Sequence, residues 1–269
     1  MSTPENEAAG LVQEGGALLR RVQEDATTGA ADDLAVEITA ADDLAAVQDF
    51  LARAEGELPR HGDAAEGVAL ELAQLAAFAR LTEINLLVNA DRLDDATRAA
   101  DRLLQAFRGR PAGESLPGFG TMLLDVVFWL LARERDEDAL RICDALIERL
   151  SGGGVAERAV AAGARFYAAQ ALGRLGRMDE SRASIESLCE MGEPALSALN
   201  RIAAQFGAAE ANPTWHVQIV ATTVTVLWQL GRTDEALELA RGAAATFERL
   251  EMPDLQAMML ELEREIAAG

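Results

Sequence analysis

The residues that could do chemistry are few and do not cluster. The two histidines, His61 and His216, lie far apart in the sequence, and neither has a cysteine, histidine or carboxylate at metal-ligand spacing. The two cysteines, Cys143 and Cys189, fall inside predicted helices, where we expect them to be buried small hydrophobes in a reducing compartment. No serine or cysteine lies in a recognisable nucleophile motif. We therefore expect no enzyme activity, no metal and no cofactor.

Pairs of carboxylates first suggest general acid–base dyads. Such pairs recur, however, in four similar stretches, each of which ends one apolar segment and opens the next. These stretches are 89–96, 133–140, 175–181 and 230–237. At the start of a helix the dipole favours negative charge, so the recurrence indicates a structural role for these acids.

The overall charge excludes several classes of partner. The chain has 24 arginines, no lysine and a formal net charge of −21. Such a surface repels phosphate backbones and anionic lipid, so we expect neither nucleic acid nor a membrane as a partner. It suits solubility, or a basic client. The acidic N-terminus has no signal-peptide pattern and the most apolar run, 118–132, is shorter than the roughly 20 residues of a membrane span, so we expect a cytoplasmic protein.

The composition predicts a helical fold. Half of the residues are hydrophobic but only 4% are aromatic, which indicates a core of Ala, Leu and Val. Segment 213–230 is rich in β-branched residues that favour strands, but Asn212-Pro213 is a good helix start. We predict helices at 1–24, about 42–57 after a capping box at Thr39 to Asp42, 64–89, 93–108, 121–133, 136–150, 155–175, 178–191, 194–206, 213–230, 233–250 and from Pro253 onward. Gly192 is expected to end one of them in a left-handed conformation.

Helix pairs recur along the chain. The small residues after the acid pairs, Ala96, Ala139, Ser181 and Ala236, are 43, 42 and 55 residues apart, and the last interval contains the additional helix at 194–206. Regular spacing of helix pairs is typical of a solenoid, in which each pair buries one face against the next.

The stretch Leu-Gly-Arg-x-Asp-Glu-Ala-Leu at 230–237 resembles the turn and second-helix start of a tetratricopeptide repeat. The resemblance covers about 64–251 and implies an all-α, right-handed superhelix of antiparallel helix pairs. The chain departs from the family in its period, above 40 rather than about 34 residues, and in lacking the closing proline. We expect N-terminal helices in 1–63, four pairs with an extra helix (194–206) in 64–251, and a C-terminal capping helix in 252–269.

In that family the first helix of each pair lines a concave groove. The resemblance therefore implies a partner-binding groove of amides, hydroxyls and aromatics, which would hydrogen-bond a peptide backbone and anchor side chains. The residues concerned are Phe78, Thr82, Asn85, Asn89, Asp125, Phe128, Phe166, Gln170, Arg174, Gln218, Thr225, Trp228 and Gln229. Alternatively, Phe78, Phe128 and Trp228 are core residues, because their helical spacing fits that role equally well.

These features favour a non-enzymatic protein–protein interaction module that binds a peptide or protein segment in the groove, as an adaptor, assembly factor or chaperone. The alternative is a regulatory or sensor module whose superhelix binds a small effector or a peptide signal. An enzyme on a helical scaffold would need converging charges in the groove, where only Asp125 and Arg174 qualify. A homodimer is plausible because solenoids leave end faces that need capping.

Overall fold

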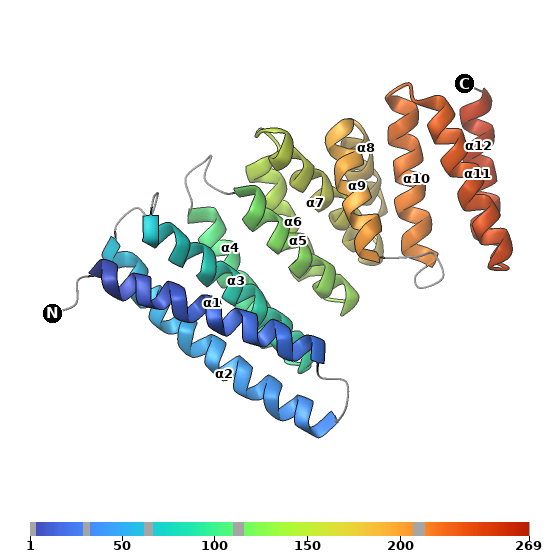
Figure 1. The fold of residues 1–269 in the computed structure, drawn as a ribbon. Coiled ribbons are helices and arrows are strands. Elements are labelled where there is room, and N and C mark those ends of the chain that lie inside the picture. Colours follow the sequence, from blue (N-terminus) through green and yellow to red (C-terminus); the bar gives the residue numbers. More distant parts are fainter. Residues whose placement is uncertain (1–3, 29–32, 62–66, 110–115, 207–212, 269) are drawn as a thin grey trace. The chain divides into compact units, whose positions relative to one another are not determined.

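The computed structural model describes residues 4–28, 33–61, 67–109, 116–206 and 213–268, and within these ranges the chain is all-α with no strand (Figure 1). The elements are α1 (Pro4–Thr28), α2 (Asp33–Glu57), the 3-10 helix η1 (Leu58–His61), α3 (Gly67–Asn89), α4 (Leu93–Gly109), α5 (Leu116–Ala132), α6 (Asp136–Leu150), α7 (Val155–Arg174), α8 (Met178–Cys189), α9 (Glu193–Phe206), α10 (Pro213–Gln229), α11 (Thr233–Arg249) and α12 (Pro253–Ala268). The chain divides into two compact units, Met1–Trp129 and Leu130–Gly269. Within the described ranges, no helix is both long enough and apolar enough to cross a bilayer.

Helix α3 is the centre of the first unit. It packs against α1, α2 and α4, which is why its sequence is apolar around most of its circumference rather than along one stripe. Phe50 and Leu51 of α2 meet Leu72 and Ala79 of α3 in the core, where all four side chains are buried.

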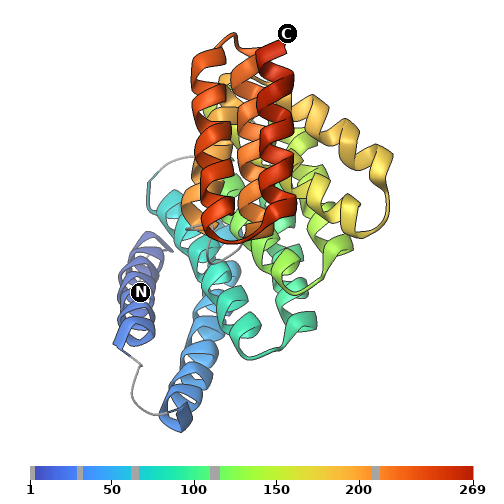
Figure 2. The ribbon, with the colours of Figure 1, turned by 90° about the vertical axis from the view of Figure 1, so that its right-hand side faces the viewer.

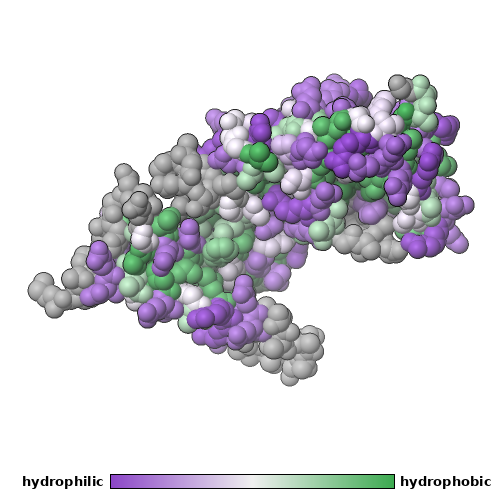
Figure 3. Space-filling model, turned by 45° about the horizontal axis from the view of Figure 1, so that its top comes forward, coloured by the Kyte–Doolittle hydropathy of each residue, from purple (hydrophilic) through white to green (hydrophobic). Residues whose placement is uncertain are grey.

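The second unit is a succession of packed helices. Helix α6 packs on α7, and α7 packs on both α8 and α9. Helix α9, the predicted extra helix, also contacts α10, and α10, α11 and α12 lie side by side (Figure 2). The face of this unit seen in Figure 3 is largely hydrophilic, with smaller hydrophobic patches between the hydrophilic residues.

The four recurrent stretches form equivalent turns. The residue before the arginine of each turn is left-handed: φ is 56° at Asp91, 58° at Glu134, 75° at Gly176 and 74° at Gly231. The backbone N–H of the arginine that follows donates to the carbonyl five residues earlier, on Leu87, Leu130, Leu172 or Leu227, at 2.8–2.9 Å. This bond closes the first helix as in a Schellman motif.

The same arginine opens the second helix of each pair. Its carbonyl accepts the N–H of the small residue, Ala96, Ala139, Ser181 or Ala236, at 3.0–3.1 Å. A fifth turn of this geometry joins α11 to α12, with Glu251 at φ 57°. The recurrence of the turns is therefore confirmed, and the structure adds one that the sequence pattern did not reveal.

Two predicted helix starts are wrong. Helix α2 begins at Asp33, so Thr39 lies within the helix and not in a capping box; the Ala, Leu and Glu residues between 33 and 42 are good helix formers. Helix α5 begins at Leu116 rather than at 121, because Pro117 is tolerated in a first turn, where its missing N–H would have no partner.

The other predicted helices occur at the expected places, and the β-branched segment after Pro213 is helical. Gly192 has the predicted left-handed conformation, with φ 64°.

Candidate functional site

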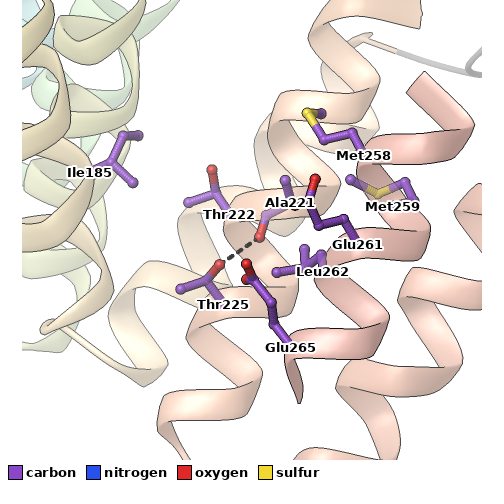
Figure 4. Close-up of a pocket in the computed structure, with 9 residues that line it drawn as sticks. All are labelled: Ile185, Ala221, Thr222, Thr225, Met258, Met259, Glu261, Leu262 and Glu265. Atoms are coloured by element: carbon purple, nitrogen blue, oxygen red, sulfur yellow. Dashed lines mark hydrogen bonds between the residues drawn. The ribbon is translucent and has the colours of Figure 1, made fainter. Parts of the chain in front are cut away.

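A pocket of about 300 Å³ lies between α8, α10 and α12 of the second unit (Figure 4). We call it the α10 groove. Its lining residues are Ile185 of α8, Ala221, Thr222 and Thr225 of α10, and Met258, Met259, Glu261, Leu262 and Glu265 of α12. One wall is thus the central helix α10, and the other two come from helices on either side of it in the sequence.

The α10 wall of the groove is apolar in effect. The hydroxyl of Thr225 donates to the carbonyl of Ala221 at 2.9 Å (Figure 4). The hydroxyl of Thr222 donates to the carbonyl of Gln218 at 2.8 Å. A hydroxyl bonded to the preceding turn of its own helix needs no other partner. These bonds also show how a segment rich in threonine and valine is accommodated in a helix.

Helix α12 divides its apolar residues between the core and the groove. Met259 and Ile266 are fully buried, whereas Met258 keeps 40% of its surface exposed. Met258 and Leu262 are one turn apart and line the groove together with Met259. Methionine is flexible and polarisable, and it adapts to partners of different shape.

Two carboxylates edge the groove. Glu261 and Glu265 are one turn apart on α12, so they share a face of the helix. Neither has a hydrogen-bond or ion-pair partner among the described residues. Glu263 between them in sequence is different, because its carboxylate binds Arg241 of α11 at 2.6 Å. The groove therefore combines an apolar surface with unpaired negative charge.

A second polar constellation lies in the first unit. The carboxylate of Glu83 is only 2% exposed and accepts hydrogen bonds from Gln48 (3.0 Å) and from Arg80, while Arg102 is 3.5 Å away. Arg80 also pairs with Glu55. The two guanidiniums and two carboxylates neutralise each other, so this cluster joins α2, α3 and α4 and has no spare charge for a ligand.

The recurrent acids bind the arginine of each turn. The second acid of each pair accepts a hydrogen bond from the arginine three residues earlier, at 2.7–2.9 Å. The pairs are Arg92–Asp95, Arg135–Asp138, Arg177–Glu180 and Arg232–Glu235. These hydrogen bonds lower the pKa of Asp95, Glu180 and Glu235. A carboxyl group with a lowered pKa does not hold a proton near neutral pH, which fits a structural role.

Both cysteines are buried and free. Burial raises the pKa of the Cys143 thiol well above its ordinary range and that of Cys189 to about 11. Because the thiolate is the reactive form, neither residue has the properties of a nucleophile.

His216 lies edge-on to the ring of Phe247, with centroids 6.0 Å apart, and the side chain of His61 is outside the described residues. Across the side chains that the structure describes, no group of three or more His, Cys, Asp or Glu is placed to hold a metal ion.

The predicted groove residues of the first unit are mostly accessible. Phe78 of α3 is 51% exposed, so it is not a core residue. Thr82 donates to the Phe78 carbonyl at 3.0 Å, Asn85 is half-buried and Asn89 is exposed. The two predicted residues of α5, Asp125 and Phe128, are half-buried and have interactions within the chain.

In the second unit only Thr225 of the predicted set lines the α10 groove. The other members do not belong to this groove: Gln170, Gln218 and Trp228 are half-buried, and Gln229 is exposed.

One predicted member of the second unit, Phe166, is wrong as a partner contact, and another, Arg174, has partners within the unit. Phe166 is completely buried, with its ring centroid 6.0 Å from Tyr167 and 6.1 Å from Trp215. The extra helix α9 packs beside it and binds Tyr167, whose hydroxyl donates to Gln205 at 3.2 Å. Arg174 donates to the Leu131 carbonyl at 2.8 Å and pairs with Asp136 at 2.6 Å, so it joins α7 to the start of α6.

Sequence reasoning missed most of the α10 groove. Ile185 is not among the predicted groove residues, and α12 was predicted only as a capping helix. The apolar arc of α12, from Leu255 through Met258, Met259 and Leu262 to Ile266, spans about 100°, the ordinary width of a stripe that packs on a core, so the sequence carried no signal of the groove.

The fold and the groove define an all-α protein with recurrent helix turns and an apolar, acid-edged surface between three helices. Comparison of the chain with protein-family models and with curated proteins gives no match.

Proposed function

We propose that the protein is a non-enzymatic interaction module of the cytoplasm that binds a segment of another protein in the α10 groove, as an adaptor, assembly factor or chaperone. In this proposal the equivalent turns belong to a tetratricopeptide-like right-handed superhelix. The observation that carries the proposal is the groove, in which apolar side chains from three helices remain accessible.

The exposure of these side chains supports a binding role. Leaving apolar surface in water forgoes about 25 cal/mol for each Å², and accessible apolar surface with a polar rim is typical of interaction sites. Met258 would be an ordinary core residue if its exposed surface were covered. A partner that covers Met258, Leu262 and Ile185 recovers this free energy on binding.

The scaffold supports the same proposal. Helices α10, α11 and α12 are joined by turns closed by backbone hydrogen bonds, and the arginine–carboxylate pair at Arg232 and Glu235 reinforces the first of them. A groove held by such turns is pre-organised, which lowers the entropic cost of binding.

Capture from a native extract with matched variants tests the proposal. Leu262→Asp places a charge in the groove, and Ala245→Asp places the same charge on an exposed position of α11. We expect a partner that binds the wild type and the Ala245→Asp variant and is lost with Leu262→Asp, while both variants keep the wild-type circular dichroism spectrum. Equal capture by all three proteins would refute the groove as the binding site. If no captured protein is lost with Leu262→Asp, and a small molecule raises the melting temperature of the wild type only, the result would favour the sensor alternative.

A further inference from the structure

We propose that the segment bound in the α10 groove is a positively charged amphipathic helix. This inference rests on the interaction function proposed above and specifies the partner of the same groove. It combines the apolar surface of the groove, its two unpaired carboxylates and the absence, among its lining side chains, of a free hydrogen-bond donor for the C=O groups of an extended chain.

The polar groups of the groove favour a helical partner. An extended peptide presents unpaired backbone N–H and C=O groups, which need partners when they are buried. The hydroxyls of Thr222 and Thr225 already donate to their own helix, and the lining contains no amide side chain. No lining side chain therefore has a free donor for the C=O groups of an extended peptide. A helix satisfies its backbone internally and presents only side chains to a groove.

The dimensions of the α12 wall also suit a helix. Its lining residues extend from Met258 to Glu265, about 10 Å or two helical turns at 1.5 Å per residue. The apolar residues Met258 and Leu262 are spaced by one turn, which matches the spacing of apolar side chains along one stripe of a partner helix. Ile185 faces them from α8 (Figure 4).

The charges favour a cationic partner. Glu261 and Glu265 repel each other one turn apart on the same helix, and they have no counter-ion among the described residues. Arginines or lysines one turn apart on a partner helix would pair with both. The net charge of −21 adds a long-range attraction for such a segment.

Binding of synthetic helices to the full-length protein tests this inference by fluorescence anisotropy. The first probe is a labelled 18-residue peptide with leucines at i, i+4, i+7 and i+11 and lysines beside them. In the second probe glutamines replace the lysines, and in the third two prolines prevent the lysine peptide from forming a helix. We expect tight binding of the first probe, weaker binding of the second and no binding of the third.

Variants of the protein locate the effect. We expect Glu261→Gln/Glu265→Gln to weaken binding of the lysine helix about tenfold at low salt and to reduce the salt dependence of its affinity. The control Glu238→Gln/Glu248→Gln removes the same charge from exposed positions of α11 and should change the affinity less than twofold. Leu262→Asp should abolish binding of the lysine and glutamine helices.

The outcomes separate this inference from the function on which it rests. If the glutamine helix binds as tightly as the lysine helix, or the groove variant behaves like its control, the charge assignment is wrong although the groove binds helices. If the proline peptide binds as well as the helix, the helical assignment is wrong. If no probe binds while Leu262→Asp still loses the native partner, only this inference is overturned. If Leu262→Asp changes neither the binding of the helical probes nor the capture of the native partner, the proposed function fails as well.

Discussion

The left-handed residue of each turn has a backbone conformation that residues with a side chain rarely adopt. Gly176 and Gly231 adopt it at little cost, whereas Asp91 and Glu134 adopt a similar φ with a side chain present. For an L residue this conformation costs roughly 1–2 kcal/mol, and Glu134 therefore stores strain that its glycine counterparts avoid.

Substitutions at these positions should have opposite effects. We expect Glu134→Gly to raise the free energy of unfolding by about 0.5–1 kcal/mol and Gly231→Ala to lower it by about 1 kcal/mol. Urea denaturation followed by circular dichroism measures both. Changes of the same sign would show that the turns are not equivalent.

The arginine–carboxylate pairs of the turns give a pH dependence with a defined sign. Hydrogen bonds from arginine lower the pKa of Glu180 and Glu235 below their ordinary value of 4.5. The unfolded chain therefore binds more protons in this range, so the stabilisation is complete above pH 4.5 and is lost as the pH falls through the lowered values.

Removal of both arginines should remove this dependence. We expect the urea midpoint of an Arg177→Met/Arg232→Met variant to fall less steeply than that of the wild type between about pH 5 and pH 3. Parallel curves for the two proteins would mean that the pairs do not contribute to stability.

At the scale of helices, the packing of α1 on α2 depends on the absence of a side chain. A Cβ atom on Gly15 would lie 2.5 Å from the ring of Phe50, which is fully buried, whereas a Cβ on Gly16 would meet nothing within 4 Å. The two neighbouring glycines thus form a matched pair for mutation.

We expect Gly15→Ala to destabilise the protein by about 1–3 kcal/mol through overpacking. Gly16→Ala should stabilise it by up to about 1 kcal/mol, because alanine has the higher helix propensity. Thermal unfolding of the two single variants measures the difference. Equal melting temperatures would show that α1 is not packed as described.

Local features of the helix pairs could be predicted from sequence. The small residues Ala96, Ala139 and Ala236 recur at the same place after each turn because the geometry of a helix and its turn is fixed, so residue spacing within the short stretches was enough to predict them. The same reasoning failed for Phe166. The additional helix α9 packs against α7, the helix that carries Phe166. Positions assigned by analogy with the other helix pairs do not show where an inserted helix packs.

At the scale of the molecule, the groove could not be predicted because it depends on contacts between distant segments. Ile185 and Leu262 are far apart in sequence, and they line one pocket only because α8 and α12 both pack against α10. The spacing of apolar residues predicts which face of a helix is buried, but it does not predict which other helix covers it. The strong acidity, in contrast, is a property of the composition and was evident at once.

Photo-crosslinking from the groove tests the central claim most directly. A diazirine side chain placed at Met258 lies in the groove, and the same group at Ala257 lies on an exposed position next to it in sequence, outside the groove. We predict that irradiation in a native extract joins position 258 to a partner segment rich in arginine or lysine, and that position 257 gives little product. Crosslinks that form equally from both positions, or from 257 alone, would contradict the assignment of the α10 groove as the binding site.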